Sequence, residues 1–490
     1  MVSKFSIPEE VTRITKSLKK GGFQAYLVGG CVRDLVAGLK PKDWDITTNA
    51  RPEEIAALFP KTFYENDYGT VSVVNEECED KSIRCVEITP FRLEAKYSDQ
   101  RRPDEVTWSN NLEDDLKRRD FTVNALALDQ DENKVIDLYS GQEDLKDKLI
   151  RAVGDPDERL SEDSLRILRG IRLATQLNFA IESETATSIS KNAHLLKIIS
   201  AERIREEFIR IIMTDQPMIG LVLANKLGVL REFLPELEEG IHVKQNGDHM
   251  YEVWEHSLRA LQHSADRKYP LHVRLAALFH DIGKPRTRKW GDEKKDWTFY
   301  GHDVVGARTA RQVLERLKFP KKTTDLIAKL VRNHMFFTDI EKITLSAVRR
   351  IIRNVGREEV WDLMSVRMCD RIGMGRPKES PYRLRKYESM IEEALRAPTS
   401  VTMLKIDGDN VIHETGLEAG PKIGHILHAL LEETLDKPEN NETDKLIARA
   451  KELAKLDKKE LKKMGEGGKE KKEKIEQAEI SKIRSKYGVK

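Results

Sequence analysis

The sequence predicts an α+β head followed by a long helical body, and three observations lead to this fold class. Strand-like apolar runs are confined to about the first 140 residues, where they alternate with helical segments. From about Asp144 onward, apolar residues recur at helical spacing and strand signals almost vanish. The length of 490 residues leaves room for about three domains of roughly 150 residues each. Together these features are typical of a multidomain α+β protein.

The head is expected to begin with a strand at Gln24–Val28, which stops at Gly29 and Gly30 and leads into a helix at Val32–Leu39. Each further strand prediction rests on a short run rich in apolar or β-branched residues. These runs are Trp44–Thr47, Val71–Val74, Arg84–Ile88 and Val123–Asp129.

The body is expected to be helical to its end, because its apolar residues recur every three or four positions. Domain boundaries are expected near Gly240–Gly247, where glycines bracket a polar stretch, and near Ala397–Ser400, where a proline interrupts the helices. The predicted helices are Leu160–Gln176, Ala201–Met213, Met218–Leu227, Trp254–Ser264, His272–His280 and Asp303–Leu317.

The composition indicates a globular, charge-rich chain with 39% hydrophobic and 34% charged residues. The 85 Lys and Arg against 83 Asp and Glu leave a net charge of +2, which argues weakly against a simple nucleic-acid coat. No apolar run is long enough to span a membrane, and the N-terminus lacks the apolar core of a signal peptide. Four scattered cysteines do not form a disulfide framework, so a cytoplasmic setting is expected.

The C-terminal tail has a different charge balance from the rest of the chain. Residues 451–490 hold 14 Lys and Arg and 8 Asp and Glu, a surplus of 14 − 8 = +6. Two interpretations stay open: a solvated or frayed helical tail, or a basic arm that contacts phosphates.

The turn at Gly29 and Gly30 is a candidate phosphate site. Glycine lets the backbone approach a ligand closely, and the start of the following helix offers N–H groups to an anion. Arg33 lies in the first turn of that helix and adds a cationic contact. A Gly-Gly turn alone is weak support for such a site.

A carboxylate pair follows about a dozen residues later. Asp43 and Asp45 are two apart on the expected strand, so both side chains should face the same side. Two carboxylates this close repel each other unless a cation lies between them, and Mg²⁺ is suited to such oxygen ligands. Either feature alone also fits a solvated loop, whereas the combination indicates phosphate chemistry.

Four segments then carry a resemblance to a known family. GGCVRD from Gly29, DWDITTNA from Asp43, RRDFTVNALALD from Arg118 and EDSLRILRGIRLATQLNF from Glu162 resemble the bacterial tRNA nucleotidyltransferase and poly(A) polymerase family. The resemblance implies a polymerase-β-like nucleotidyltransferase head followed by an all-α neck, body, HD domain and tail. The expected domains are a head at 1–142, a neck and body at 143–240, an HD domain at 241–396 and a tail at 397–490.

The resemblance also implies the chemistry of the head. Asp43 and Asp45 would hold two Mg²⁺ ions, one activating the RNA 3′-hydroxyl and the other clamping the nucleoside triphosphate. Glu87, in RCVEITPFR, is the candidate third carboxylate, and an ordinary surface glutamate is the alternative.

The RRD segment would contact the ribose and phosphates of the nucleotide through Arg118, Arg119 and Asp120. A salt-bridge cluster at a helix end is the alternative for these three residues. Glycines 29 and 30 and Arg33 would complete the nucleotide-binding set.

Base selection is implied for Asp163 and Arg166, which are expected on one helix as i, i+3 neighbours. Cytosine and adenine both present an amino donor beside a ring-nitrogen acceptor, which a carboxylate and a guanidinium can read together. Uracil and guanine present the reverse pattern. One Asp/Arg pair can therefore accept CTP and ATP without a nucleic-acid template.

The member of the family is harder to assign from the sequence. Gly69, Thr70 and Val71 follow the form usual in tRNA nucleotidyltransferases rather than the basic stretch of poly(A) polymerases. The expected activity is C and A addition to tRNA 3′ ends. A CC-adding or A-adding specialist and a poly(A) polymerase remain alternatives.

The helical body carries a second constellation that resembles the HD superfamily of metal-dependent phosphohydrolases. Imidazoles and carboxylates in this order can hold one or two divalent metals, either a transition metal or Mg²⁺, that activate a water. The implied activity is a phosphatase or 2′,3′-cyclic phosphodiesterase, with a site that only holds RNA as the alternative. The ligand set is His256, His280, Asp281, His302, His334 and Asp370.

The tail segment Leu404–Leu431 resembles the C-terminal part of HD-containing tRNA nucleotidyltransferases, with Gly416, Gly420 and Gly424 at its turns. Its backbone N–H groups are expected to hold phosphates of the tRNA acceptor stem and elbow, and ordinary helix connectors are the alternative. No membrane and no protein partner are implied. A different class, an HD phosphohydrolase with the head as an RNA-binding module, is disfavoured by the intact Asp43 and Asp45 pair.

Overall fold

The computed structural model shows two compact units. The first consists of Met1–His334 and Ser365–Pro377, and the second of Met335–Met364 and Lys378–Lys490. The structure describes residues 5–64, 69–76, 78–95, 105–247, 249–293, 295–335, 344–396, 404–457, 460–461 and 476–489. The predicted boundary at Ala397–Ser400 lies outside these residues.

The head of the first unit is built on a mixed sheet of seven strands. They are β1 (Ala25–Val28), β2 (Asp45–Thr48), β3 (Thr62–Tyr64), β4 (Val71–Val74), β5 (Cys85–Pro90), β8 (Leu126–Asp129) and β9 (Lys134–Asp137). Their spatial order is β3-β4-β5-β2-β1-β8-β9. Strands β2 and β5 are parallel, and the other neighbours pair antiparallel. Strands β6 (Arg92–Ala95) and β7 (Glu105–Trp108) form a separate antiparallel pair.

Helices cover the sheet, and their apolar spacing explains why. Helix α1 (Glu9–Lys20) places Val11, Ile14 and Leu18 in the head core, because residues three and four apart share one face. Burying each of these side chains contributes about 1.5–3 kcal/mol. The other head helices are α2 (Gly30–Val36), α3 (Pro52–Leu58), α4 (Leu112–Lys117), η1 (Thr122–Asn124) and α5 (Gly141–Asp147).

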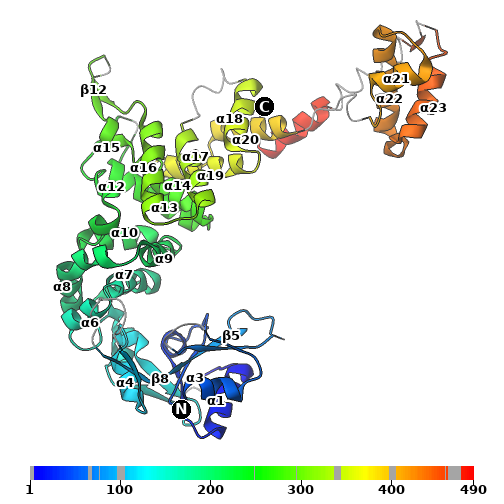
Figure 1. Ribbon diagram of the computed structural model, residues 1–490. Helices are drawn as coiled ribbons and strands as arrows, with labels where there is room; N and C mark the ends of the chain where they lie inside the picture. Colours follow the sequence, from blue (N-terminus) through cyan, green and yellow to red (C-terminus); the bar gives the residue numbers. More distant parts are fainter. Residues whose placement is uncertain are drawn as a thin grey trace. The chain divides into compact units, whose positions relative to one another are not determined.

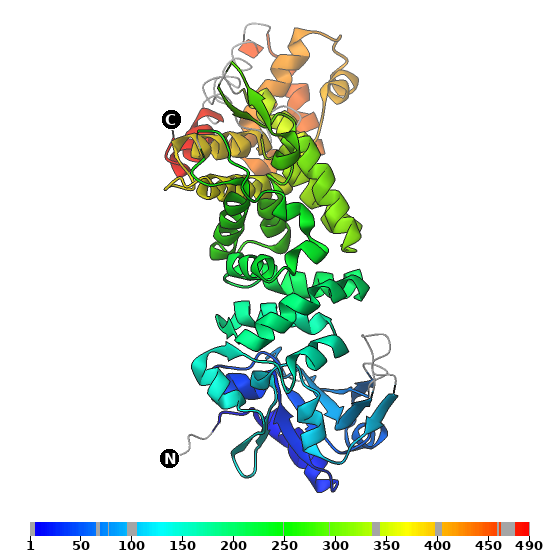
Figure 2. The ribbon, with the colours of Figure 1, turned by 90° about the vertical axis from the view of Figure 1, so that its left-hand side faces the viewer.

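The body follows the head as a stack of helices, and in Figures 1 and 2 these helices lie between the head sheet and α13 (Val253–Asp266). Gly170 allows the close approach to the head, because a Cβ there would lie 2.9 Å from the ring of Phe121. The body elements are α6 (Pro156–Glu162), α7 (Leu165–Leu177), α8 (Ser183–Asn192), η2 (Ala193–Ile198), α9 (Ala201–Ile212), α10 (Pro217–Lys226), α11 (Leu230–Phe233) and α12 (Pro235–Glu238).

The predicted helix Leu160–Gln176 is divided into α6 and α7. Asp163 has extended backbone angles, φ −135° and ψ 100°, and ends α6. Its side chain accepts a hydrogen bond from the Leu165 N–H, which competes with helix continuation. The expectation that Asp163 and Arg166 share one continuous helix is therefore wrong.

A third group of helices completes the first unit. They are α13, α14 (Leu271–Phe279), α15 (Lys284–Thr287), α16 (His302–Arg316), α17 (Lys321–Asn333) and the C-terminal part of α19 (Glu359–Gly373). Two short strand pairs interrupt the helical part of the unit, which the helical periodicity did not predict. One is the parallel pair β10 (Leu149–Ile150) and β11 (Ala180–Ile181), and the other is the hairpin β12 (Lys289–Gly291) and β13 (Asp296–Thr298).

The second unit is helical in its described residues. Its elements are α18 (Leu345–Val355), the N-terminal part of α19, α20 (Tyr382–Leu395), α21 (Gly408–Thr415), α22 (Pro421–Asp436), η4 (Pro438–Asn440), α23 (Thr443–Leu453) and a helix at 476–486. Helices α21, α22 and α23 share a core that includes Val411, Ile426, Leu430 and Leu446.

The C-terminal helix at 476–486 packs against α20. Arg484 pairs with Glu393 at 3.0 Å, Lys486 pairs with Glu392 at 2.7 Å, and the Tyr487 hydroxyl donates to Glu392. Basic residues at the end of the chain are thus already neutralised in part.

Among the described residues, no helix is long and apolar enough to cross a membrane.

Candidate active site and metal centre

The three head carboxylates converge where β2 lies beside β5. In this parallel pair Asp45 and Glu87 are register partners, so their side chains project from the same face of the sheet. Asp43 lies in the bend before β2 rather than on the strand, which corrects the expectation that both aspartates share one strand. Pro41 precedes this bend and has no N–H to donate to a strand partner.

The electrostatics of this cluster favour a bound cation. Burial, together with the neighbouring Asp43 and Glu87 carboxylates, raises the pKa of Asp45 to about 7 against the opposing effect of Arg119. A divalent metal held by these oxygens would remove the repulsion, and hard oxygen ligands fit Mg²⁺. The residues present therefore fit the metal that the sequence predicts here.

Gly29 turns the chain at the edge of the carboxylate cluster. Its backbone φ is +79°, a value that residues with a side chain rarely adopt. A Cβ at this position would lie 3.1 Å from Arg119 Nη1 and 3.7 Å from Asp45 Oδ2. The glycine thus keeps open the space between a cationic and an anionic side chain.

The predicted arginines lie around the same space and are held by protein acceptors. The Arg33 guanidinium donates to Asp34 Oδ1 at 2.7 Å and to Asn124 Oδ1 at 2.8 Å. Arg118 and Arg119 both pair with the buried Asp115, at 2.6 and 3.0 Å. These contacts fix the arginines before a ligand binds, which lowers the entropy lost on binding.

Asp120 has a different environment from its two arginine neighbours. Its Oδ2 accepts two hydrogen bonds from Arg169, at 2.8 and 2.6 Å, and its Oδ1 accepts from the Phe121 N–H. Burial favours the neutral acid, but Arg169 outweighs it and holds the pKa of Asp120 well below its usual range. Asp120 therefore anchors α7 to the head, a role closer to the salt-bridge alternative than to nucleotide contact.

The side chains of Asp163 and Arg166 do not form an ion pair with each other. Asp163 Oδ2 pairs with Arg203 of α9 at 2.7 Å. The Arg166 guanidinium donates to Glu162 Oε2 at 2.6 Å and to the backbone carbonyl of Arg118 at 2.9 Å. Each side chain of the expected base-reading pair is thus oriented by a separate set of contacts.

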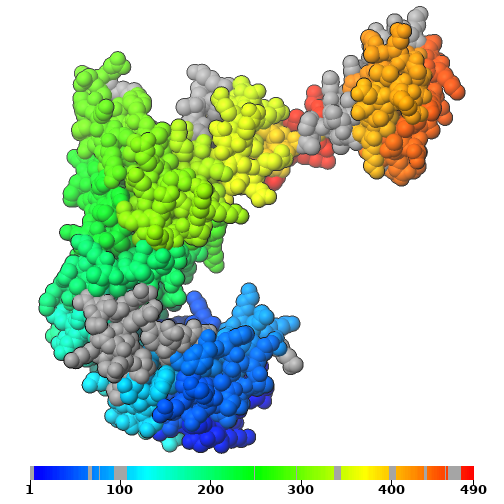
Figure 3. All heavy atoms as spheres, viewed as in Figure 1, coloured from blue at the N-terminus to red at the C-terminus, as the bar shows by residue number. Residues whose placement is uncertain are grey.

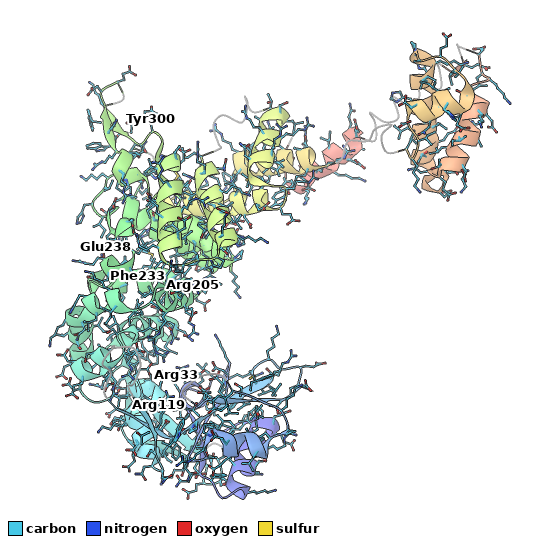
Figure 4. The ribbon with its side chains drawn as sticks, in the orientation of Figure 1. Arg33, Arg119, Arg205, Phe233, Glu238 and Tyr300 are labelled. Atoms are coloured by element: carbon cyan, nitrogen blue, oxygen red, sulfur yellow. The ribbon has the colours of Figure 1, made fainter. Side chains whose placement is uncertain are left out.

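The predicted residues of the head and neck line one cavity of about 750 Å³ between the head and α7 and α9. The head, in blue and cyan, adjoins the body, in green, on the molecular surface, and Arg33 and Arg119 lie on the side of the head nearest the body (Figures 3 and 4). The cavity lining includes every site residue that the sequence predicts in the head and neck: Gly29, Gly30, Arg33, Asp43, Asp45, Glu87, Arg118, Arg119, Asp120, Asp163 and Arg166.

The cavity also contains cationic residues that the sequence analysis missed. Arg169 and Arg172 follow Arg166 at i+3 and i+6, a spacing that could have revealed them. Arg203 and Arg210, from α9, are brought in only by tertiary packing. Two buried donors, Arg119 Nε and Arg203 Nη1, have no hydrogen-bond partner among the described residues. Unpaired buried donors of this kind are costly, and an anionic ligand satisfies them.

The predicted HD residues meet in a second, separate cluster within the first unit. Six side chains from five helical segments are less than a tenth exposed: His256, His280, Asp281, His302, His334 and Asp370. They form two groups that could each hold a metal ion, and Asp281 belongs to both. One group adds His256, His280 and Asp370, and the other adds His302 and His334.

Backbone carbonyls fix the ring orientation of three of these histidines. The Nδ1 atoms of His280, His302 and His334 each lie 2.7 Å from a carbonyl oxygen three residues earlier. Since a carbonyl can only accept, each Nδ1 carries the proton and each Nε2 offers its lone pair to the cluster. This is the tautomer that a metal ligand needs.

Asp281 lies between the two groups. Its Oδ2 is 2.9 Å from His256 Nε2 and 3.2 Å from His280 Nε2, whereas its Oδ1 is 3.4 Å from His302 Nε2. Burial alone would lower the pKa of His280, but Asp281 and Asp370 outweigh it and raise that pKa to about 10. Positive charge is therefore favoured beside Asp281 and Asp370, and the nitrogen and oxygen donors of the cluster fit divalent metals.

Three protein families match successive parts of the chain. The "Poly A polymerase head domain" matches residues 25–151, and the "Probable RNA and SrmB- binding site of polymerase A" matches residues 178–241. The "HD domain" matches residues 246–380.

Curated relatives and solved structures agree with these matches. A CCA-adding enzyme of Ligilactobacillus salivarius is 31% identical over 91% of this chain and 98% of its own length. A CC-adding tRNA nucleotidyltransferase of Thermus thermophilus is 34% identical over 83% and 89%. The crystal structure of the Bacillus stearothermophilus CCA-adding enzyme in complex with CTP covers 91% of this chain and 98% of its own, with 27% identity and a TM-score of 0.60. The chain belongs to the bacterial tRNA nucleotidyltransferase family of CCA-adding enzymes, in a form that carries an HD domain.

Proposed function

We propose that this protein adds C, C and A from CTP and ATP to the 3′ end of tRNA without a nucleic-acid template. The observation that carries the proposal is the single cavity that joins the Asp43, Asp45 and Glu87 carboxylates to Asp163 and Arg166. Nucleotidyl transfer needs cation-binding carboxylates, phosphate donors and a means of reading the base. One cavity supplies all three.

The carboxylates and arginines divide the work of the transfer step. Divalent ions bound by Asp43, Asp45 and Glu87 would activate the 3′-hydroxyl and neutralise the triphosphate. Arg118 and Arg119, already oriented by Asp115, direct cationic groups toward the phosphates. The Arg119 Nε, buried without a partner among the described residues, is a donor available to a phosphate oxygen.

Base selection follows from the two oriented side chains of the neck. Asp163 keeps lone pairs for the amino group of cytosine or adenine while Arg203 holds one of its oxygens. The Arg166 guanidinium donates to the adjacent ring nitrogen. Uracil and guanine would place an oxygen against the Asp163 carboxylate and an N–H against the guanidinium, so both are rejected.

Product length tests this proposal against its alternatives. We would incubate tRNA transcripts ending before CCA, after C and after CC with CTP alone, ATP alone or both. A CCA-adding enzyme completes all three transcripts and stops. Products ending at CC indicate a CC-adding specialist, addition only to the CC transcript an A-adding specialist, and long A tails a poly(A) polymerase.

The division of labour along the chain is part of the same proposal. We assign nucleotidyl transfer to residues 1–142, base selection and RNA contact to 143–240, a metal-dependent hydrolase to 241–396, and contact with the tRNA acceptor stem and elbow to 397–490. The glycine turns before α22 support the last assignment, because their N–H groups can face phosphates.

The HD cluster supports a second activity, hydrolysis of phosphate esters at RNA ends. The two groups of side chains that share Asp281 would hold divalent ions, which would supply an activated water for hydrolysis. The test is the double variant His280→Ala/Asp281→Ala. Loss of 2′,3′-cyclic phosphate hydrolysis with C and A addition retained supports two independent sites. A wild-type protein without bound metal and without hydrolysis refutes the second activity.

A further inference from the structure

The hairpin β12–β13 connects α15 to α16 beside the HD cluster, and in Figure 1 it projects from the helices around it. Trp290 and Trp297 are direct cross-strand partners in this hairpin. Their rings meet edge to face, with centroids 5.2 Å apart. The pair therefore lies on one face of the hairpin.

A cation and another ring lie at the base of the hairpin, where Arg288 precedes β12 and Phe299 follows β13. Phe299 is buried, at 7% exposure, next to the last residue of β13. The Arg288 guanidinium stacks over the Trp297 ring at 3.6 Å from its centroid. Lys284 Nζ lies 5.6 Å from the centroid of Phe299. We call Lys284, Arg288, Trp290, Trp297 and Phe299 the aromatic row.

One end of the aromatic row touches the HD cluster. The Phe299 carbonyl accepts the hydrogen bond from His302 Nδ1 at 2.7 Å. Lys284 Nζ is 2.6 Å from Asp281 Oδ2. A ligand lying along the row would thus have one end next to the shared carboxylate of the two metal groups.

The other end of the row is open to solvent. Trp290 is 53% exposed although it belongs to the aromatic pair. At the end near the HD cluster, Tyr300 follows Phe299, is labelled in Figure 4 and is 76% exposed. Large exposed rings beside stacked arginine are the features with which proteins bind the bases of unpaired RNA.

Charge favours the same class of ligand. Arg288 and Lys289 line or flank the row, Lys284 is paired with Asp281 and Gln245 at its inner end, and the proposed HD activity would act on a phosphate ester. A nucleic-acid strand offers flat bases to the rings and phosphates to the cations, whereas an acidic peptide offers no bases to stack. The observations therefore favour RNA over protein.

We propose that the aromatic row binds the unpaired nucleotides at an RNA 3′ end and directs the terminal phosphate to the HD cluster. The proposal rests on the proposed second activity, since it names how that site holds its substrate. Bases stack on Trp290 and Trp297, and the Arg288 guanidinium holds the Trp297 ring in place. Lys284 then lies next to the phosphate.

The experiment measures binding and hydrolysis separately in the full-length, metal-loaded protein. The binding probe is a fluorescent RNA tetranucleotide with a 3′-phosphate, which the head cannot extend. Stacking of one base is worth about 1–3 kcal/mol, so Trp290→Ala should weaken binding roughly 5- to 150-fold. Trp290→Tyr keeps a stacking ring and should restore most of the affinity.

A matched control lies on the opposite face of the same hairpin. Thr298 donates a hydrogen bond to the Lys289 carbonyl at 3.0 Å, so Thr298→Ala weakens the hairpin and leaves the rings in place. Wild-type binding by Thr298→Ala, with weak binding by Trp290→Ala, supports the row. Equal losses of affinity in Trp290→Ala, Trp290→Tyr and Thr298→Ala overturn it, as does wild-type affinity in Trp290→Ala.

Hydrolysis of a 2′,3′-cyclic phosphate on the same tetranucleotide separates the two proposals. Binding that depends on Trp290 without any hydrolysis refutes the second activity and leaves the row as an RNA site. Hydrolysis whose KM is unchanged in Trp290→Ala refutes the row and leaves the second activity standing.

Discussion

At the scale of single residues, the charge around Asp45 links the fold to the chemistry. Its carboxylate is placed beside Glu87 by strand register and near Asp43 by the bend before β2. Burial and repulsion from these carboxylates raise the pKa of Asp45 to about 7, so a proton and a metal can each neutralise this carboxylate near neutral pH. Metal and proton therefore compete for the same oxygen.

This competition predicts a pH dependence of nucleotide addition. The pKa of Asp45 is raised to about 7, so below pH 7 the carboxyl is neutral and binds Mg²⁺ weakly. At limiting Mg²⁺, CMP incorporation should rise about tenfold per pH unit below 7 and level off above it. Raising the Mg²⁺ concentration should shift the midpoint to lower pH. Initial rates at several Mg²⁺ concentrations check this, and a midpoint independent of Mg²⁺ contradicts it.

The pH dependence of folding stability that Asp45 causes is opposite in sign to that of most acidic residues. Asp45 has a higher pKa in the folded chain than the roughly 3.9 of an unfolded one, so its ionisation opposes folding. Without metal, this contribution to stability declines as the pH rises from about 4 to 7. Asp45→Asn should lack this decline, which denaturant unfolding at pH 5 and pH 8 with chelator present would show.

Arg203 supplies a further prediction at the residue scale. Its guanidinium pairs with Asp163 Oδ2, so Arg203→Ala should free Asp163 to rotate and weaken base discrimination. A hydrogen bond to a charged group is worth about 1.5–3 kcal/mol, so the preference for CTP and ATP over UTP and GTP should fall about 10- to 150-fold. Ratios of kcat/KM measure this.

Arg205 is the matched control for Arg203, because it lies on the same helix and donates to the Lys318 carbonyl instead. Arg205→Ala should keep wild-type discrimination. Arg203→Lys, which retains the charge, should restore part of it. Equal discrimination in Arg203→Ala and Arg205→Ala would show that Asp163 does not depend on this ion pair.

At the scale of elements, the HD cluster depends on five helical segments meeting at Asp281. The tautomers of His280, His302 and His334 are fixed by the last turn or first turn of their own segments. Local backbone thus prepares each ligand, and packing brings the ligands together.

Shared ligation by Asp281 predicts unequal effects of substitutions on metal content. The wild-type HD cluster should hold two divalent ions, His302→Ala should hold one, and Asp281→Asn should bind both at least about tenfold more weakly. His242→Ala, an exposed histidine nearby in sequence, is the control and should keep both. Elemental analysis after dialysis measures the stoichiometry. The same metal content in His302→Ala and Asp281→Asn would argue against two separate groups.

At the scale of the whole molecule, the small net charge of +2 conceals local differences. The head cavity gathers arginines from α2, α7 and α9 around a carboxylate cluster. The basic C-terminus is partly neutralised, since Arg484 and Lys486 pair with glutamates of α20. Of the two interpretations of the tail, a purely frayed helix does not describe residues 476–489.

Binding of tRNA by the tail predicts a change in the salt dependence of affinity. A chain ending at residue 396 should bind tRNA with a shallower slope of log affinity against log salt, by about 0.7–0.9 for each phosphate that the tail neutralises. A chain ending at residue 461 is the control, because it also lacks the helix at 476–486 and keeps α21–α23. Equal slopes for the two truncated chains would contradict a role for α21–α23.

The amino-acid sequence alone was enough to predict the fold class and the family, and to name residues that line the head cavity and form the HD cluster, because these depend on local signals. The bounds of each predicted head strand lie within three residues of the observed bounds. The motifs that contain Asp43 and Asp45 and the HD residues are short runs, and the residue types in them indicate metal binding. The folded chain was needed to establish that Glu87 lies beside Asp45, that Asp163 ends a helix and pairs with Arg203, and that Asp281 serves two metal groups. These contacts join residues distant in the chain, and their positions follow from strand register and helix packing, which no local periodicity contains.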